Sequence, residues 1–258
     1  MPDKFIDLCA AAGSVLALCM LGGVSVAAGP APIPGYIKAA VAEPTRPDRD
    51  RQRDADRKPE QVIAFAGIKP GDQLAELMPG GGYFTRIFCR VVGPTGHVYA
   101  VSVTPVIKRE RPASPEAEQV TPNPCSNLSA DSTPAADFSL PAGLDVVWTS
   151  ENYHDLHNAM FGSPDMKAFD SAIFKALKPG GVFIVEDHAA EAGSGARDTE
   201  TLHRIDAGLV RQEVTSAGFV FVAASAVLYN ADDPHTVKVF ELHGMSDKFL
   251  LKFRKPRR

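Results

Sequence analysis

The chain has 258 residues, of which 45% are hydrophobic and 22% are charged, values that suit one α/β domain with short extensions. Its formal net charge at pH 7 is -4. Proteins that bind nucleic acid normally carry a basic excess, so we expect no nucleic-acid partner.

Residues 1–28 have the pattern of a secretory signal peptide. No charged residue occurs between Leu8 and Ala28, the stretch 15–21 is apolar, and 26–28 offers small residues to a signal peptidase. One alternative is an uncleaved membrane anchor, because about 20 apolar residues also span a bilayer, and the other is a cytoplasmic protein with a misread start. We therefore expect a periplasmic or secreted protein, which touches the membrane only if this segment is retained.

Residues 29–58 follow as a linker and a charged N-terminal arm. The run 29–35 is rich in Pro and Gly, and 46–58 mixes basic and acidic side chains densely. Such a segment is typical of a solvated helix or a flexible arm. The alternative is that it folds over the mouth of an active site as a cap. We expect the folded domain to span 59–258.

A strand, a glycine-rich turn, a helix and a second strand follow one another early in this domain. The buried run 73–78 predicts the first strand, 86–92 predicts an amphipathic helix, and 97–103 predicts the second strand. This order is a βαβ unit, whose two strands lie parallel in one sheet.

The turn after the first strand is suited to a ligand. Gly80, Gly81 and Gly82 let the backbone approach a ligand without a Cβ collision, and the unpaired N–H groups that open the helix favour a carboxylate or phosphate. Glu76, at the end of the strand, can receive an ammonium group. A dinucleotide is the weaker match, because Thr85 stands where G-x-G-x-x-G has its last glycine. A tight turn without a ligand is the other alternative.

These motifs resemble a family of predicted class I S-adenosylmethionine (SAM) dependent methyltransferases, many of them exported from bacteria. The resemblance runs from Arg57 onward, except for a Pro-rich middle. It implies a Rossmann-like α/β fold, with a seven-stranded, mostly parallel sheet and helices on both faces, and it implies SAM as the cofactor. The similar stretches are 57–71, E-L-M-P-G-G-G-Y-F-T at 76–85, 152–156, 177–181, 186–188 and 248–256. The predicted cofactor-binding residues are Glu76, Met78, Gly80, Gly81, Gly82, Tyr83, Ser102, Asp137, Asn152 and Tyr153.

The second strand departs from the family pattern. Typical class I methyltransferases end this strand with Asp or Glu, which accepts hydrogen bonds from the ribose hydroxyls, but Ser102 occupies the position here. A neutral hydroxyl binds less strongly, so we expect reduced SAM affinity unless another residue takes over. The Pro-rich insertion 104–141 excludes a long regular helix and leaves the third strand unplaced. Asp137, or else Asp131, is the candidate for an adenine contact there.

The candidate catalytic residues follow the next predicted strand, 144–149. Parallel α/β sheets bind ligands beyond the carboxyl ends of their strands, so 150–155 should face the transferable methyl group. His154 is the best candidate for a general base, with Asp155 or Asp187 to orient it. The alternative is that His154 and Asp155 only cap the next helix.

Two further residues complete the predicted site. Tyr153 could hold the sulfonium of SAM by cation–π attraction. His188 comes just after the predicted strand 182–185 and is a second candidate for the base.

The rest of the chain reads as core elements. A helix with Ser163 as its N-cap and a helix over 202–214 precede two strands, 219–228 and 249–253, which we expect to form an antiparallel edge. Polar residues that could approach the site from this part are His203, Arg204, Asp206 and 232–235.

The cysteines and histidines show no metal-ligand spacing, so we expect no metal. Cleavage after residue 28 would leave Cys89 and Cys125 in an oxidising compartment, where a disulfide is allowed. Their spacing does not decide whether they pair.

The motifs favour a SAM-dependent methyltransferase that acts on a small molecule. Two alternatives stand beside it. One is an exported, non-catalytic binding protein that kept the fold and lost the chemistry, which Ser102 favours. The other is an NAD(P)-linked oxidoreductase. The acceptor and the oligomeric state are not predicted.

Overall fold

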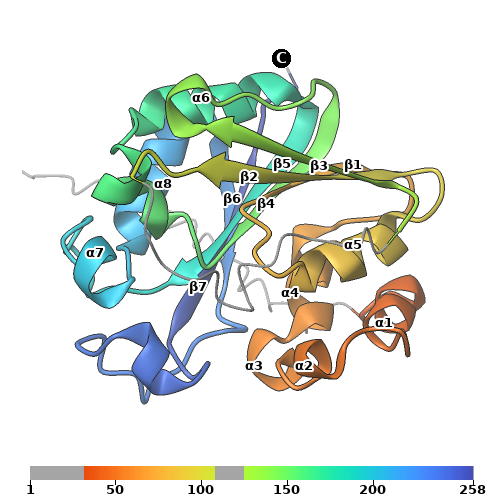
Figure 1. The fold of residues 1–258 in the computed structure, drawn as a ribbon, viewed down its shortest axis with the longest axis horizontal. Coiled ribbons are helices and arrows are strands. Elements are labelled where there is room, and N and C mark those ends of the chain that lie inside the picture. Colours follow the sequence, from red (N-terminus) through yellow and green to blue (C-terminus); the bar gives the residue numbers. More distant parts are fainter. Residues whose placement is uncertain (1–31, 108–124, 258) are drawn as a thin grey trace, which may run out of the picture. The chain divides into compact units, whose positions relative to one another are not determined.

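The computed structural model describes residues 32–107 and 125–257, and from Ile33 onward the chain forms one compact unit (Figure 1). The predicted signal peptide at 1–28 lies outside the described residues, as does 108–124 of the Pro-rich insertion. None of the helices in the described part combines the length and the apolar character that a membrane span requires.

A seven-stranded sheet forms the centre of this unit (Figure 1). The strand order is β3-β2-β1-β4-β5-β7-β6, and every neighbouring pair is parallel except those that β7 makes with β5 and β6. The predicted fold class is therefore confirmed. The strands are β1 (Gln73–Leu77), β2 (His97–Thr104), β3 (Leu128–Pro134), β4 (Leu144–Ser150), β5 (Leu177–His188), β6 (Val220–Ser225) and β7 (Lys248–Arg254).

Helices cover both faces of the sheet because side chains alternate along each strand. Trp148 and Ile184 point to one face, where they belong to the same buried cluster as residues of α1, α4 and α5. Val147 and Phe183 point to the other face and belong to the cluster that contains α6 and α8. The helices are α1 (Gly35–Val41), α2 (Asp48–Arg51), α3 (Asp54–Arg57), α4 (Pro59–Ala66), α5 (Tyr83–Val92), α6 (Met166–Ala176), α7 (Thr199–Leu202) and α8 (Ala207–Ser216).

The segment expected to be a linker and a solvated arm is, from residue 33, part of the compact unit. It forms α1, α2 and α3, and α1 buries Ile37 against the core. Its charges are largely paired: Arg46 donates to Asp54, and Asp50 accepts two hydrogen bonds from Arg86 of α5. The dense mixture of signs reflects these specific ion pairs rather than solvation.

The Pro-rich insertion contains the strand that sequence patterns left unplaced. β3 runs parallel to β2 at the edge of the sheet, with Ser102 opposite Ser132. Most β3 side chains are exposed, which explains why the strand lacks a hydrophobic signature. Just before it, Cys125 forms a disulfide with Cys89 of α5.

Two predicted helix positions are wrong in detail. Asp165, not Ser163, caps α6, because its carboxylate accepts hydrogen bonds from the backbone N–H groups of Lys167 and Ala168. The helix expected over 202–214 is two helices, α7 and α8. They are separated at His203, whose φ of 56° does not fit a right-handed helix.

The disulfide gives a testable prediction for stability. Reduction, or the substitution Cys125→Ser, should lower the free energy of unfolding by roughly 4 kcal/mol, because the bond closes a loop between residues 36 apart and restricts the unfolded chain. Urea unfolding with and without a reductant measures this. A midpoint that reductant leaves unchanged in the wild type would show that the bond does not form.

Candidate functional site

The loop between β1 and α5 has an unusual backbone. Met78, Gly80 and Gly82 all have positive φ, at 48°, 53° and 75°, so every second residue of the loop is left-handed. The methionine is the one of the three that is not glycine, and it adopts this conformation at a steric cost. Gly82 is the N-cap of α5 and offers no side chain to the first N–H groups of the helix. These groups are therefore available to an anionic ligand.

Glu76 lies at the carboxyl end of β1, beside this loop. It is 3% exposed, and its carboxylate accepts a hydrogen bond of 2.5 Å from Thr85 in the first turn of α5. Burial raises the pKa of Glu76 to about 8, although the Thr85 hydrogen bond and the charges of Arg57 and Arg86 oppose the shift. A cationic ligand beside this carboxyl group would stabilise its ionised form.

Asn152 holds the loop in place from β4. Its side-chain amide donates to the carbonyl oxygens of Leu77 and Met78, at 3.3 and 2.9 Å, and its Oδ1 accepts a hydrogen bond from Thr149. The predicted cofactor residue Asn152 thus reaches the glycine loop, but its polar atoms bind protein. In this structure it positions the backbone around the loop.

The buried cation Arg57 lies beside the carboxyl end of β4. The guanidinium of Arg57, from α3, forms an ion pair with Glu151 just after β4, and it lies 4.8 Å from the ring centroid of Tyr83 and 5.4 Å from that of Phe84. Lys248, at the start of β7, lies 3.4 Å from the other oxygen of Glu151. Burial alone would raise the pKa of Glu151, but Arg57, His188 and Lys248 hold it far below its usual range.

Glu186 is a third carboxyl group near the carboxyl ends of the strands, beside Glu76 and Glu151. It lies opposite Ser150 in the β4–β5 register and is fully buried. Burial and the neighbouring Glu151 raise its pKa to about 7. The buried carboxyls of Glu76 and Glu186 and the partly buried carboxyl of Glu151 therefore gather near two buried cations, Arg57 and Lys248.

His154 lies on the other face of the same edge, in the short 3-10 helix η3 (His154–His157). The buried carboxylate of Asp187, at the end of β5, accepts hydrogen bonds from the backbone N–H and from Nδ1 of His154, both 2.8 Å long. Burial lowers the pKa of His154, but the charge and hydrogen bond of Asp187 outweigh burial and raise it overall. The structure thus pairs the predicted base with one of its two predicted orienting residues.

The other predicted catalytic residues lie close to His154. Asp155 Oδ1 is 3.4 Å from His154 Nε2. His188 is 6.0 Å from His154 between ring centroids, and its Nδ1 is 2.8 Å from the hydroxyl of Ser246. Burial lowers the pKa of His188 to about 4, although nearby carboxylates oppose this. His188 is therefore a neutral ring at physiological pH.

Three predicted cofactor residues do not reach the glycine loop with their side chains. Tyr153 is 0% exposed, and its hydroxyl lies within hydrogen-bond distance of Asp170 and Glu213, at 3.0 and 3.1 Å, between α6 and α8, so its cation–π role stays a prediction. Ser102 is exposed on β2. Asp137 is exposed in a one-turn 3-10 helix (Ala135–Asp137) after β3.

The side chain of Tyr83 is buried and makes its hydrogen bond within the protein. It is 5% exposed, and its hydroxyl donates to Asp54 of α3 at 2.6 Å. Arg204, one of the residues that could approach the site, is instead fully buried in a two-bond ion pair with Asp233. The site residues that sequence reasoning missed are Arg57, Glu151 and Lys248, whose partners are distant in sequence.

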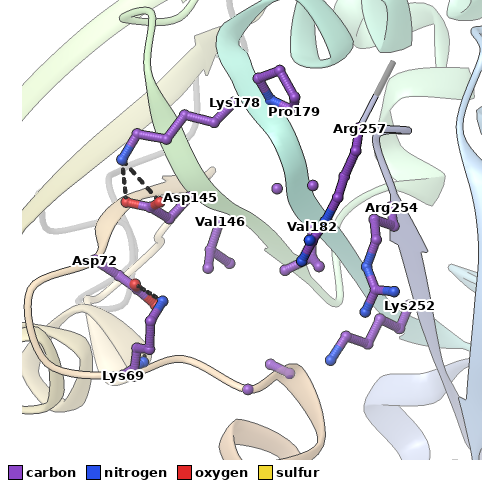
Figure 2. Close-up of a pocket in the computed structure, with 14 residues that line it drawn as sticks. Lys69, Asp72, Asp145, Val146, Lys178, Pro179, Val182, Lys252, Arg254 and Arg257 are labelled. Atoms are coloured by element: carbon purple, nitrogen blue, oxygen red, sulfur yellow. Dashed lines mark hydrogen bonds and ion pairs between the residues drawn. The ribbon is translucent and has the colours of Figure 1, made fainter.

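A separate pocket of about 310 Å³ lies at the opposite edge of the sheet (Figure 2). Figure 2 shows Lys69 paired with Asp72, and Lys178 with Asp145, near the amino ends of β1, β4 and β5. Ligands of parallel α/β sheets bind at the carboxyl ends of the strands. The pocket therefore does not mark the cofactor site.

Known proteins similar to this chain include methyltransferases. No family model matches the chain. The ubiquinone/menaquinone biosynthesis C-methyltransferase UbiE of Burkholderia mallei is 28% identical over 128 residues, which cover 48% of this chain and 46% of UbiE. The chain thus spans less than half the length of the curated relatives it matches.

Solved structures of methyltransferases are similar in fold to this chain. A SAM dependent methyltransferase from Aquifex aeolicus has a TM-score of 0.55 at 16% identity and covers 81% of this chain and 98% of its own. The protein has the class I methyltransferase fold. An S-adenosylmethionine dependent methyltransferase from Mesorhizobium loti is also similar, with a TM-score of 0.51 at 14% identity and coverage of 75% and 95%. At these identities structural likeness shows the fold alone, and the match to UbiE adds a distant sequence relationship to methyltransferases.

The buried ion pair of Arg57 yields a prediction. Arg57→Met should lower the free energy of unfolding at pH 7 by about 2–3 kcal/mol, because Glu151, whose side chain is only 15% exposed, loses its nearest cation. Arg53→Met is the matched control: Arg53 approaches the same carboxylate at 3.6 Å, but its side chain is 53% exposed, so the effect should stay within about 0.5 kcal/mol. Urea unfolding at pH 7 compares the two variants, and equal effects would contradict the prediction.

The same variants have an expected pH dependence. The folded-state pKa of Glu151 lies below its ordinary value of 4.5, so its ion pair stabilises the fold above that pH and is lost as the pH falls. The gap in stability between the wild type and Arg57→Met should therefore narrow below about pH 4.5. A gap that stays constant down to pH 3.5 would argue against charge as its cause.

Proposed function

We propose that this protein binds SAM at the β1–α5 loop and transfers its methyl group to a small-molecule acceptor. The observation that carries the proposal is the buried carboxyl of Glu76 beside a loop with left-handed backbone at Met78, Gly80 and Gly82. The fold and the relationship to methyltransferases support it. The acceptor is identified only by class.

The charges near the loop suit the two ends of the methionyl group of SAM. Its ammonium group would pair with Glu76, and its carboxylate would face the N–H groups that open α5. The sulfonium centre is a further positive charge. The carboxyls of Glu76 and Glu186 have raised pKa values, so a cationic ligand beside them would favour their ionised forms.

The acceptor side of the proposed site is the region after β4 and β5. Methyl transfer is an in-line displacement at carbon, so the protein mainly has to align the acceptor and remove its proton where one is present. His154 is oriented by Asp187 through Nδ1, which directs Nε2 away from that carboxylate. His154 is the proposed general base, with Asp155 and His188 beside it.

We also propose that the protein is exported. The apolar segment in 1–28 motivates this, and the disulfide between Cys89 and Cys125 supports it, because such bonds persist in oxidising compartments. SAM would then have to reach the protein outside the cytoplasm. Export is tested by the size and location of the mature chain: cleavage near residue 28 and recovery in the periplasm are expected.

SAM binding is the direct test of the proposed function. Calorimetric titration should show binding of SAM and S-adenosylhomocysteine and none of NAD. Glu76→Gln should weaken SAM binding by at least about tenfold, the loss of one charge-assisted bond. Asp145→Asn, a carboxylate at the opposite edge of the sheet, is the control and should bind normally. Absence of SAM binding by the wild type would contradict the proposal and favour a non-catalytic protein that has the methyltransferase fold.

The same titration has an expected pH dependence. The raised pKa of Glu76, about 8, means that the carboxyl is mostly protonated at neutral pH and must lose its proton to pair with an ammonium. SAM affinity should therefore rise between pH 6 and pH 7.5, by up to about tenfold per unit. Thr85, Arg57 and Arg86 are the groups that act on the pKa of Glu76 besides burial. A flat profile, equal to that of Glu76→Gln, would remove Glu76 from the site.

A further inference from the structure

Three side-chain atoms of the kinds that bind metal ions lie close together near the carboxyl ends of the strands. His154 Nε2 lies 3.3 Å from His203 Nδ1 and 3.4 Å from Asp155 Oδ1, and the last two atoms are 3.7 Å apart. His154 and Asp155 follow β4, whereas His203 comes from the break between α7 and α8. Sequence spacing therefore shows no metal motif, and only the fold brings the three residues together.

The separations decide which geometry the three atoms fit. Ligands at 2.0–2.1 Å from a metal lie about 3.3–3.4 Å apart in a tetrahedral site and about 2.8–3.0 Å apart at neighbouring octahedral positions. Two of the observed separations are 3.3 and 3.4 Å, and the third is slightly longer. The arrangement matches three corners of a tetrahedron.

His154 also has the outer partner that metal-bound histidines usually have. Asp187 is acceptor-only when ionised, so Nδ1 of His154 donates to it across 2.8 Å and Nε2 keeps its lone pair for the cluster. Asp187 is itself 0% exposed and also accepts from the backbone N–H of His154. The ring is thereby fixed in both tautomer and direction.

His203 is held in place as well. Its backbone has φ of 56°, a conformation that a residue other than glycine adopts at a cost. Its ring packs at 4.7 Å against Phe240 and at 5.4 Å against His154, between centroids. The side chains of His203 and Asp155 are 27% and 24% exposed, so the cluster is open to solvent on one side.

We propose that His154, Asp155 and His203 bind a divalent cation of the zinc type, with a fourth position open to water or another ligand. Two imidazoles and one carboxylate form a donor set that suits zinc and its neighbours, and three protein ligands with one open position are typical of catalytic sites. The assignment does not require SAM binding.

The cation would change the role of His154 in methyl transfer, a consequence that rests on the proposed function. A ring nitrogen bound to a metal no longer accepts a proton. The open position would instead receive an oxygen, nitrogen or sulfur atom of the acceptor and favour its deprotonated form. His154 would then be a ligand, and Asp187 a positioning residue.

Cobalt is a suitable probe because tetrahedral Co2+ absorbs visible light and zinc displaces it. The untagged full chain, freed of metal with a chelator, is titrated with CoCl2 and then with ZnCl2. We expect about one Co2+ per chain, with intense visible bands that zinc removes. His203→Ala and Asp155→Ala should abolish these bands. Asp187→Asn should weaken binding by about 10–100-fold.

His97→Ala is the matched control, because His97 lies at the start of β2 and contacts Ser129. It should keep full binding. A wild-type chain that shows no tetrahedral cobalt spectrum would overturn the proposal, as would bands that persist in His203→Ala. SAM titration of the same samples keeps the two ideas apart: cobalt binding without SAM binding supports the metal site and argues against the transfer reaction.

Discussion

The ion pair between Arg57 and Glu151 is the interaction on which the carboxyl edge of the sheet depends. Glu151 and Glu186 are carried there by neighbouring strands, and burial would neutralise or expel such groups if no cation accompanied them. The cation comes from the N-terminal segment, not from the sheet. The helix α3 is thus part of the electrostatics of the site, and α1 is part of the core.

The four consecutive residues 151–154, which follow β4, contact different parts of the protein on the two faces of the sheet. Glu151 meets Arg57 on the α5 face, and Asn152 fixes the backbone at the end of β1. Tyr153 anchors the segment between α6 and α8, and His154 meets Asp187. One short segment therefore couples the proposed cofactor side to the proposed acceptor side. A displacement of Tyr153 would move both.

Local pattern predicted most of the fold. The first βαβ unit has continuous apolar strands and a glycine turn, so its elements could be placed from residues alone. The exposed edge strand β3 and the break at His203 could not, because neither depends on a hydrophobic period. At the site, the positions of Glu76 and the glycines follow from one contiguous motif. Arg57 and His203 find their partners only through the tertiary fold.

The position of β7 has a consequence for how the chain is made. β7 lies between β5 and β6, so the strand that comes last in chain order among those of the described sheet is the one that joins β6 to the other strands. Before residues 248–254 emerge from the ribosome, β5 presents an open edge and β6 has no neighbour in the described sheet. Open strand edges invite pairing with other chains. The nascent protein therefore exposes the edge of β5 to aggregation, or to a chaperone, until β7 has been made.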